Sequence, residues 1–346
     1  MKYTRCSIYR FKFKSAKFIL RKFIKNKRVG DISPNLKVGG DLEVEVKNVV
    51  VIGSLNFDII VKQQRMPNKG ETFIADELVQ GPGGKGANQA AQCAKLGLPT
   101  VMVGKVGDDR FGEALVGSLT AFGVNTSYIK KLGSTGMGLV HVMPDGDYYS
   151  TIVKGANDLI TRNDIDEIAH LLDSSSFIVL QQEIPEDVIE YIITKYESND
   201  LKIVLNNAPA REVREDILKY VDVLVVNETE ASFMSGKPIN SAADAINIGK
   251  EMLPLTGGMV VITLGKDGSV VVTESYSNFF PAENVQAVDA TGAGDSFIGA
   301  LIYAMSEGLS IDQCMKFATH ISAITVTKEG GQHSFPTKTE IESILI

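Results

Sequence analysis

Tryptophan is absent from the 346-residue sequence, and cysteine and histidine are rare. Cys6, Cys93 and Cys314 are odd in number and widely separated, which argues against a disulfide framework or a zinc site and indicates reduced thiols inside a cell. The histidines lack the spacing of metal ligands, so we expect surface or core roles for His141, His170, His320 and His333. No apolar run approaches the roughly 20 residues of a membrane helix, so we expect no membrane span.

Basic residues are scarce outside the first part of the chain. Residues 1–28 hold 11 of the 35 lysines and arginines and no acidic residue, which leaves 24 basic against 42 acidic residues in the remainder. The excess of acidic residues outside 1–28 repels polyanions, so we expect no nucleic-acid partner. Residues 1–28 are either an organellar transit segment or a disordered extension without an address. We expect a cytoplasmic protein, or a mitochondrial-type location if these residues act as a transit segment.

The remaining sequence indicates one α/β unit. Residues 29–46 resemble a linker, so 1–46 form a basic extension and the folded domain is expected at 47–346. Strands that are apolar on both faces and joined by helices are typical of a doubly wound, mostly parallel sheet flanked by helices. Strands are predicted at 49–52, 100–103, 177–180, 203–205, 223–226 and 260–264, and helices at 87–96, 185–196, 211–220 and 240–253.

Two segments, at about 58–80 and 128–154, break this alternation of strands and helices. Both alternate apolar and polar residues, and residues 144–147 (Pro-Asp-Gly-Asp) have the composition of a hairpin turn. We expect a small antiparallel sheet that projects from the main layer. Such a sheet is a candidate lid over a site at the carboxyl ends of the strands.

The motif at residues 288–296 (Val-Asp-Ala-Thr-Gly-Ala-Gly-Asp-Ser) carries the most chemical information. Its glycines let successive backbone N–H groups turn inward, and the helical pattern that follows adds the positive end of a helix dipole. Such a concavity favours anions, above all phosphate. Asp295 lies beside it and is itself negative. This arrangement suggests a base that deprotonates a hydroxyl while backbone amides stabilise a transferring phosphoryl group.

A second glycine-rich stretch, residues 81–89, precedes the predicted helix at 87–96. Its glycine spacing differs from that of a P-loop, and Lys85 is not followed by serine or threonine. The stretch brings backbone amides, the Lys85 ammonium and the Asn88 carboxamide close to a polar ligand. A glycine-rich turn at a helix start is the alternative, and the interleaved Lys and Asn favour the functional interpretation.

Polar residues follow several predicted strands, where ligands bind in open α/β sheets. Asn56 and Asp58 suit sugar hydroxyls, although such residues also form turns. Glu183 follows another strand and is alternatively an acid at a helix start. Asn227 and Glu230 are spaced to hold a hydrated Mg²⁺ beside phosphates or to form a helix capping box. Residues 263–268 end a further strand in a tight turn that either admits a nucleotide or reverses the chain.

Taken together, these motifs resemble the ribokinase family of phosphofructokinase-B-type carbohydrate kinases over about residues 47–346. Several motifs in one order are far more specific than any single one. They are Asn56-Phe57-Asp58, Gly83-Gly84-Lys85-Gly86-Ala87-Asn88, Asn227-Glu228-Thr229-Glu230, Thr263-Leu264-Gly265, Gly292-Ala293-Gly294-Asp295 and Lys328-Glu329-Gly330-Gly331-Gln332 with Ser334 and Pro336.

The resemblance implies transfer of the ATP γ-phosphate to the 5-hydroxyl of D-ribose, with Mg²⁺ as cofactor. Matching positions imply Asp295 as general base and an anion hole from Gly292, Ala293 and Gly294. The residues implied to hold the sugar are Asn56, Asp58, Gly84, Lys85, Gly86, Ala87, Asn88, Glu183 and Asp295. Those implied to line the ATP site are Asn227, Thr263, Gly265, Gly268, Gly294 and Thr319, with Mg²⁺ near Asn227 and Glu230.

The resemblance also implies activation by a monovalent cation, usually K⁺, and a homodimer formed through the lid sheet. The matching cation ligands are Asp289, Thr291, Thr325, Lys328, Gly330 and Ser334, several through backbone carbonyls. The sequence departs from the family at Ala290, where Thr or Pro is usual, and at Ile298, where members acting on ribose often have a polar residue. Two alternatives remain: a related kinase acting on 2-deoxyribose, a nucleoside or a hexose, and a catalytically silent sugar-binding protein.

Overall fold

The computed structural model describes residues 48–145, 148–197 and 201–345. The predicted basic extension and linker at 1–46, and part of the predicted turn at 144–147, lie outside these ranges. Within them, no helix is both long and apolar enough to cross a membrane.

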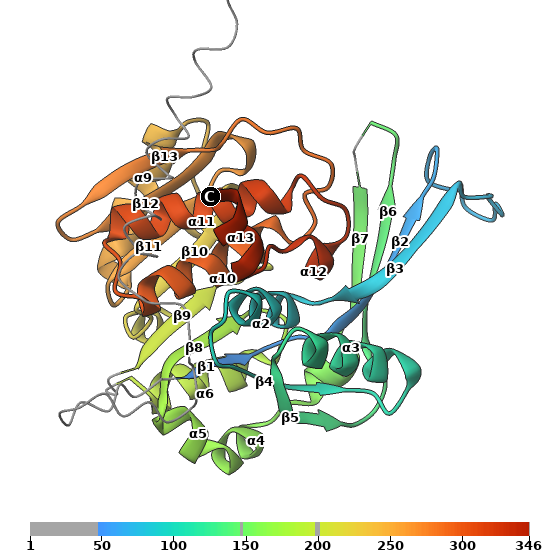
Figure 1. Cartoon of the computed structure of the whole chain (residues 1–346), viewed down its shortest axis with the longest axis horizontal. Coiled ribbons are helices and arrows are strands. Elements are labelled where there is room, and N and C mark those ends of the chain that lie inside the picture. The colour runs from blue at the N-terminus through green and yellow to red at the C-terminus, as the bar shows by residue number, and fades with distance from the viewer. Residues whose placement is uncertain (1–47, 146–147, 198–200, 346) are drawn as a thin grey trace, which may run out of the picture.

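A nine-stranded sheet forms the centre of the molecule, in the order β13-β12-β11-β10-β9-β8-β1-β4-β5 (Figure 1). Its neighbouring strands pair in parallel from β5 to β11, and β12 and β13 add an antiparallel edge. The strands are β1 (Asn48–Ile52), β4 (Thr100–Val106), β5 (Asn125–Lys131), β8 (Ser175–Gln181), β9 (Lys202–Asn206), β10 (Val223–Asn227), β11 (Met259–Thr263), β12 (Gly268–Thr273) and β13 (Ser277–Pro281). The predicted doubly wound, mostly parallel sheet is confirmed.

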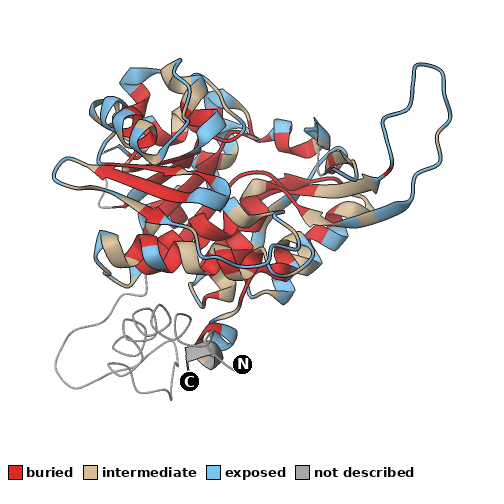
Figure 2. Cartoon of the chain, turned by 90° about the horizontal axis from the view of Figure 1, so that it is seen from above, coloured by how far each residue is buried: buried red, intermediate tan, exposed pale blue. Residues whose placement is uncertain are grey.

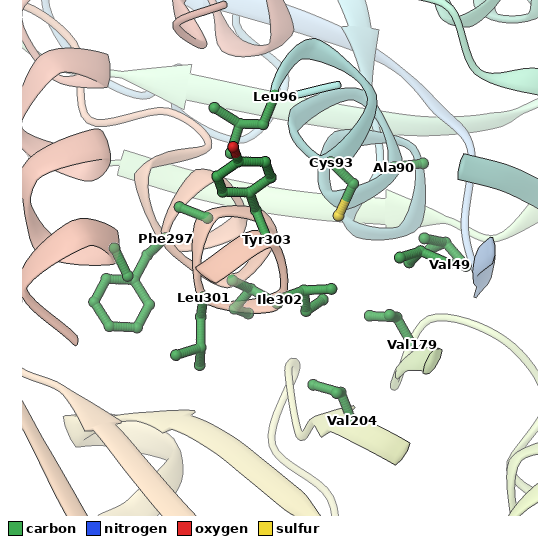
Figure 3. Close-up of a cluster of buried hydrophobic side chains, with 14 of the residues drawn as sticks. Val49, Ala90, Cys93, Leu96, Val179, Val204, Phe297, Leu301, Ile302 and Tyr303 are labelled. Carbon is green, nitrogen blue, oxygen red and sulfur yellow. The ribbon is translucent and has the colours of Figure 1, made fainter. Parts of the chain in front are cut away.

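Helices cover both faces of this sheet, because side chains alternate between two apolar clusters. Along β1, Val49 and Val51 belong to one cluster and Val50 and Ile52 to the other. Figure 3 shows the first cluster, where helices α2 and α10 meet above strand valines. This face carries α2 (Lys85–Lys95), α3 (Arg110–Ala121), α10 (Ala293–Ser306), α11 (Ile311–Thr325) and α13 (Lys338–Leu345). The other carries α4 (Arg162–Glu167), α5 (Ala169–Asp173), α6 (Glu186–Lys195), α7 (Glu215–Leu218), α8 (Glu228–Ser235) and α9 (Ala242–Met252).

A second, four-stranded sheet projects from the body and is largely exposed at its outer end (Figures 1 and 2). Its order is β3-β2-β6-β7, built from β2 (Asn56–Lys62), β3 (Glu77–Gly83), β6 (Gly136–Val142) and β7 (Tyr148–Val153). We call it the lid sheet. Its β6 and β7 pair antiparallel across the predicted turn, whereas β2 and β6 pair in parallel.

Several boundaries differ from the sequence prediction. The segment predicted as lid from residue 128 begins inside β5, which pairs in parallel with β4 in the main sheet. The helix predicted at 211–220 shortens to α7, because residues 211–214 are not helical. Helix α2 begins two residues early, at Lys85, because Gly84 adopts a positive φ of 90° and lets the chain turn into the helix there.

Candidate active site

Asp295 lies in the first turn of α10, where α10 packs against α2. Its side chain is buried, and both carboxylate oxygens accept side-chain hydrogen bonds: Oδ2 from Asn88 Nδ2 at 2.9 Å and Oδ1 from Gln89 Nε2 at 2.9 Å. Burial raises the pKa of Asp295, while the Lys85 ammonium and the two amides act to lower it. The result is a desolvated carboxylate held in one orientation.

The backbone just before Asp295 forms the start of α10. Gly292 takes the left-handed conformation (φ 75°), and a Cβ there would lie 2.8 Å from the Phe335 ring, so glycine is required on both counts. The Ala293 N–H closes a turn onto Ala290 O at 3.1 Å. Gly294 is exposed and would have open space around a Cβ. The start of α10 is therefore accessible at Gly294, directly beside Asp295, as an anion site needs, whereas the Ala293 N–H is already engaged.

Glu183 gathers the polar groups at the carboxyl ends of β1 and β8. Its Oε2 accepts hydrogen bonds from Ser54 Oγ at 2.5 Å, from Asn56 Nδ2 at 3.3 Å and from the Lys85 N–H at 3.3 Å. The Oδ1 of Asn56 accepts in turn from Asn157 Nδ2 at 2.7 Å, which fixes the orientation of the Asn56 amide. Two segments distant in sequence, 54–56 and Lys85, thus converge on one carboxylate.

The glycine-rich stretch allows two backbones to approach closely at this point. A Cβ on Gly84 would lie 2.6 Å from Asn56 N, and one on Gly86 would lie 2.7 Å from Ser54 N. Ala87 N–H donates to Ser54 O at 2.9 Å, and the Ala87 side chain is buried. The start of α2 is thereby held against residues 53–56, which places Lys85 and Asn88 beside Glu183 and Asp295.

Asp58 lies on β2 of the lid sheet, between two glycines. A Cβ on Gly83 or on Gly138 would come within 1.9 Å and 2.3 Å of its carboxylate oxygens. Burial, followed by the negative charges of Glu183 and Asp295, raises the pKa of Asp58 to about 7, against a lowering by Lys85. Three carboxylates and one ammonium therefore face the same small region, a suitable lining for a polyhydroxylated ligand.

Four of the residues predicted for the nucleotide lie at or just after the ends of β10 and β11: Asn227, Thr263, Gly265 and Gly268. Asn227 is the register partner of Thr263. Asn227 and Glu230 form a capping box: Asn227 Oδ1 accepts from Glu230 N–H and Glu230 Oε2 from Asn227 N–H, both at 2.8 Å. The helix capping box, one of the two alternatives that the sequence left open for these residues, is therefore present. Gly265 is exposed, whereas Gly268 is buried in the turn into β12. Thr319 Oγ1 is buried and has no hydrogen-bond partner within the described ranges.

Asn227 and Glu230 fit Mg²⁺ only in the mode in which the ion keeps several of its waters. The described residues hold no group of three or more His, Cys, Asp or Glu side chains suited to a metal ion. Mg²⁺ commonly keeps several waters and is held by one or two carboxylates plus substrate phosphates. Asn227 and Glu230 have oxygen atoms that could serve that mode, although Asn227 Oδ1 and Glu230 Oε2 already accept the capping-box hydrogen bonds. Burial raises the pKa of Glu230 despite its bond to the Asn227 backbone.

The residues predicted for a monovalent cation lie around Asp289. Its Oδ1 accepts from Thr291 N–H at 2.8 Å and its Oδ2 from Gly330 N–H at 3.0 Å, so the carboxylate ties two loops together. The other predicted side chains have protein partners: Thr325 Oγ1 lies 2.7 Å from Ser296 Oγ, Lys328 Nζ pairs with Glu340 at 2.9 Å, and Ser334 Oγ donates to Gly331 O at 2.7 Å. These side chains are therefore already engaged within the protein.

A set of buried amides lies behind Asp295 and was not predicted from the sequence. Gln89 contacts the carboxylate directly, and Gln332 Nε2 donates to Asn88 Oδ1 at 3.1 Å. Gln181 and Asn206 in turn contact Gln89. A usable signal was present in the sequence, because Gln181 and Asn206 are polar residues that directly follow the apolar runs 177–180 and 203–205. Only the fold brings them to one point.

The chain is similar to known proteins over most of its length. The chain matches the model of the pfkB family carbohydrate kinases over residues 46–338. The chain belongs to this family. This kinase is similar to the ribokinase of Bacillus subtilis, with 36% identity over 301 residues that span 87% of the chain and 100% of the relative. It is also similar to the deoxyribokinase of Salmonella typhi, with 33% identity over 292 residues that span 84% of the chain and 95% of that relative.

Among solved structures, the pfkB-family kinase is similar to Arabidopsis thaliana ribokinase complexed with ribose and ATP. The TM-score is 0.79 and the identity 30%, and the match covers 87% of this chain and 99% of the other. The family assignment, the kinase activity and the ribokinase-like fold that the motifs predicted are therefore confirmed.

Proposed function

We propose that this kinase transfers the γ-phosphoryl group of ATP to the 5-hydroxyl of D-ribose, giving ribose 5-phosphate and ADP. The observation that carries the proposal is Asp295: a buried carboxylate beside the open N-terminus of α10 and within the polar cluster of Asp58, Glu183 and Lys85. Similarity to kinases named for ribose and to one complexed with ribose and ATP supports it. A 2-deoxyribose substrate is the second candidate, because a deoxyribokinase is nearly as similar.

In this mechanism Asp295 accepts the proton of the attacking hydroxyl. Asn56, Asp58, Asn88 and Glu183 hold the sugar, and Lys85 offsets their negative charge. The first N–H groups of α10, at Gly292 to Gly294, stabilise the charge on the transferring group. Holding hydroxyl and phosphoryl in line is itself a large part of catalysis. Closure of the lid sheet over the sugar excludes water.

The nucleotide is proposed to lie over the ends of β10 and β11, lined by Asn227, Thr263, Gly265, Gly268 and Thr319. Asn227 and Glu230 would hold Mg²⁺ through water beside the phosphates. When bound, Mg²⁺ neutralises phosphate charge. The loop carbonyls near Asp289 and Gly330 would hold K⁺, whose charge strengthens the anion site at the start of α10.

We further propose a homodimer formed through the lid sheet. Leu78, Val61, His141 and Tyr149 form one row across this sheet, on the face opposite Asp58. The ends of the row are open, with Leu78 55% and Tyr149 59% exposed. Val153 belongs to the same face and is also exposed. A second copy of the sheet is the occupant that would cover matching apolar rows.

The decisive experiment measures ADP release by the purified full chain with ribose, 2-deoxyribose, nucleosides and hexoses, each in KCl and in NaCl. We expect ribose to give the highest kcat/KM and KCl to raise it. The Asp295→Asn variant should lose turnover by roughly 10²–10⁴-fold, the usual contribution of a positioned base. It should still bind ribose by calorimetry, because its sugar contacts remain.

Asp312→Asn is the matched control, since Asp312 is an exposed acid on α11 whose partner is Lys316, one turn away. It should keep normal turnover. Near-normal kcat in Asp295→Asn would remove Asp295 as the base, and a preference for another sugar would replace ribose as the substrate. Ribose binding without turnover of any sugar would favour the sugar-binding alternative, and equal rates in both salts would remove the K⁺ proposal.

A further inference from the structure

Gln89 is a fully buried residue whose carboxamide is completely engaged beside Asp295. Its Nε2 donates to Asp295 Oδ1 at 2.9 Å and to Asn206 Oδ1 at 3.2 Å. Its Oε1 accepts from Gln181 Nε2 at 2.7 Å. Three polar side chains thus meet on one amide in an apolar interior, where each unmade hydrogen bond is costly.

The orientation of the Gln89 amide is fixed from outside the site. Asn206 Nδ2 donates to Val225 O at 3.1 Å, and a backbone carbonyl only accepts hydrogen bonds. The Asn206 oxygen must therefore face Gln89, and it faces the Gln89 NH₂ group. A flipped Gln89 amide would bring its oxygen against the oxygens of both Asn206 and Asp295.

Gln181 holds the opposite side of the Gln89 amide, and this arrangement leaves one of its own polar atoms unpaired among the described residues. Its Oε1 is buried and has no hydrogen-bond partner within the described ranges. The same oxygen occupies the space of a side chain at Gly53, where a Cβ would lie 1.9 Å away. Buried polar atoms are normally hydrogen-bonded, so an unpaired oxygen in this position needs an explanation. The explanation is that the Gln181 NH₂ group must face the Gln89 oxygen. A flipped Gln181 amide would place its own oxygen against Gln89 Oε1.

We propose that Gln89, locked by Gln181 and Asn206, is a positioning residue that orients Asp295 and keeps it an ionised proton acceptor. This inference rests on the proposed role of Asp295 as the base. Asn88 performs the same service for the other carboxylate oxygen and is itself held by Gln332. Each oxygen of the base thus receives one amide N–H, and a second amide braces each donor.

The charged groups around Asp295 remain the same when Gln89 is changed. Lys85 at the start of α2 lowers the pKa of Asp295, and Glu183 after β8 raises it. Asp58 on β2 and Glu230 on α8 are coupled to it as like charges. From α11, two hydroxyls reach the start of α10: Ser322 Oγ donates to Ala293 O, and Thr325 Oγ1 lies 2.7 Å from Ser296 Oγ. A shift in the pH profile therefore reports the missing amide.

The test compares the pH profiles of kcat for wild type, Gln89→Met, Gln181→Met and Gln92→Met in the full chain. Methionine keeps the length and removes the amide. Gln92 is the matched control: it is equally buried on the same helix, and its Nε2 bonds to Pro336 O. We expect Gln89→Met to lower kcat roughly ten- to a hundredfold, as for loss of a hydrogen bond to a charged group. KM for the sugar should change little.

The acid limb of the Gln89→Met profile should move to higher pH by about one unit, because Asp295 loses a bond that favours its charged form. Gln181→Met should move it in the same direction by less, and Gln92→Met should leave it in place. If Gln89→Met does not fold, Gln181→Met decides, since it leaves every contact of Asp295 intact.

An unshifted profile in both Gln89→Met and Gln181→Met, or an equal shift in Gln92→Met, overturns the inference. Its failure is distinguishable from failure of the proposed function. If Asp295→Asn is inactive and the Gln89 profile is unshifted, only the inference falls. If Asp295→Asn keeps its turnover, the base assignment falls first.

Discussion

At the scale of single residues, Asp58 shows how the fold changes ordinary acid chemistry. It belongs to a strand of the projecting lid sheet, yet its carboxylate points between glycines toward the body. Burial and the neighbouring acids Glu183 and Asp295 raise its pKa to about 7, because they disfavour the charged carboxylate. In the proposed complex, a sugar hydroxyl that donates to this carboxylate would favour its charged form.

The Asp58→Asn variant tests the cost of this buried charge by its effect on the free energy of unfolding. Folding favours the protonated Asp58, so its contribution to stability is fully present below the unfolded pKa of about 4 and is lost as pH rises toward about 7. Removing the charge should therefore stabilise the protein by about 1–3 kcal/mol at pH 8 and by less at pH 5.5. Urea unfolding at both pH values measures the difference.

The same variant should bind the sugar less well, because an amide replaces a charged acceptor. Asp312→Asn, at an exposed position, should show no stabilisation that grows with pH. A stability difference between Asp58→Asn and wild type that is constant from pH 5.5 to 8 contradicts a raised pKa at Asp58.

At the scale of elements, the lid strands fit the site because two of them carry glycine opposite Asp58. Gly138 on β6 is the register partner of Asp58, and Gly83 lies two residues beyond its register partner on β3. Alternation along a strand places these positions on the Asp58 face of the sheet. The strands therefore leave space for one carboxylate and, next to it, for a ligand.

Gly138→Ala should displace Asp58 without unfolding the lid. The added Cβ would lie 2.3 Å from Asp58 Oδ1, which forces the carboxylate to rotate. We expect KM for the sugar to rise roughly tenfold, equivalent to one good hydrogen bond, with a much smaller change in kcat. Steady-state kinetics at saturating ATP measures both.

Gly117→Ala is the matched control, because Gly117 lies exposed on α3 and a Cβ there would meet nothing within 4 Å. That change should leave KM unaltered and stabilise the helix by about 0.4–1 kcal/mol. An unchanged sugar KM in Gly138→Ala would contradict the role of Asp58 in holding the sugar.

At the scale of the whole molecule, the lid sheet extends beyond the body (Figure 2). Several of its apolar residues are exposed. Its face opposite Asp58 carries the exposed residues Leu78, Tyr149 and Val153. Exposed apolar clusters of this kind mark interaction surfaces, and self-complementary rows suit a twofold dimer. The proposed dimer would also fix the position of each lid relative to its site.

Leu78→Lys should break this dimer, since it places a charge in the row without disturbing a buried contact. Light scattering during gel filtration should give twice the chain mass for wild type and the chain mass for the variant. Phe233→Lys changes a similarly exposed side chain on α8, 53% against 55%, and should leave the dimer intact. A wild-type monomer at micromolar concentrations would refute the dimer.

Much of this protein was predictable from its sequence. The alternation of apolar strands and helices predicted the doubly wound sheet, because both periods are local. The order of short motifs predicted the kinase family, because glycines and acids at fixed spacing have few other uses. Errors came where position in the fold outweighs local pattern. The strand at Asn125–Lys131 has the polar alternation of a lid strand, yet β4 recruits it to the main sheet.

The sequence by itself determined the layers of the fold, the family and the identity of the proposed base, since each is written in local periodicity or in a contiguous motif. The tertiary structure decided what surrounds that base. Gln89, Gln181 and Asn206 come from one helix and two strands, and only packing of α2 against α10 and the sheet joins them to Asp295. The physical reason is that the pKa and orientation of a buried carboxylate depend on neighbours in space. Gln89, which contacts the carboxylate directly, lies 206 residues from Asp295 along the chain.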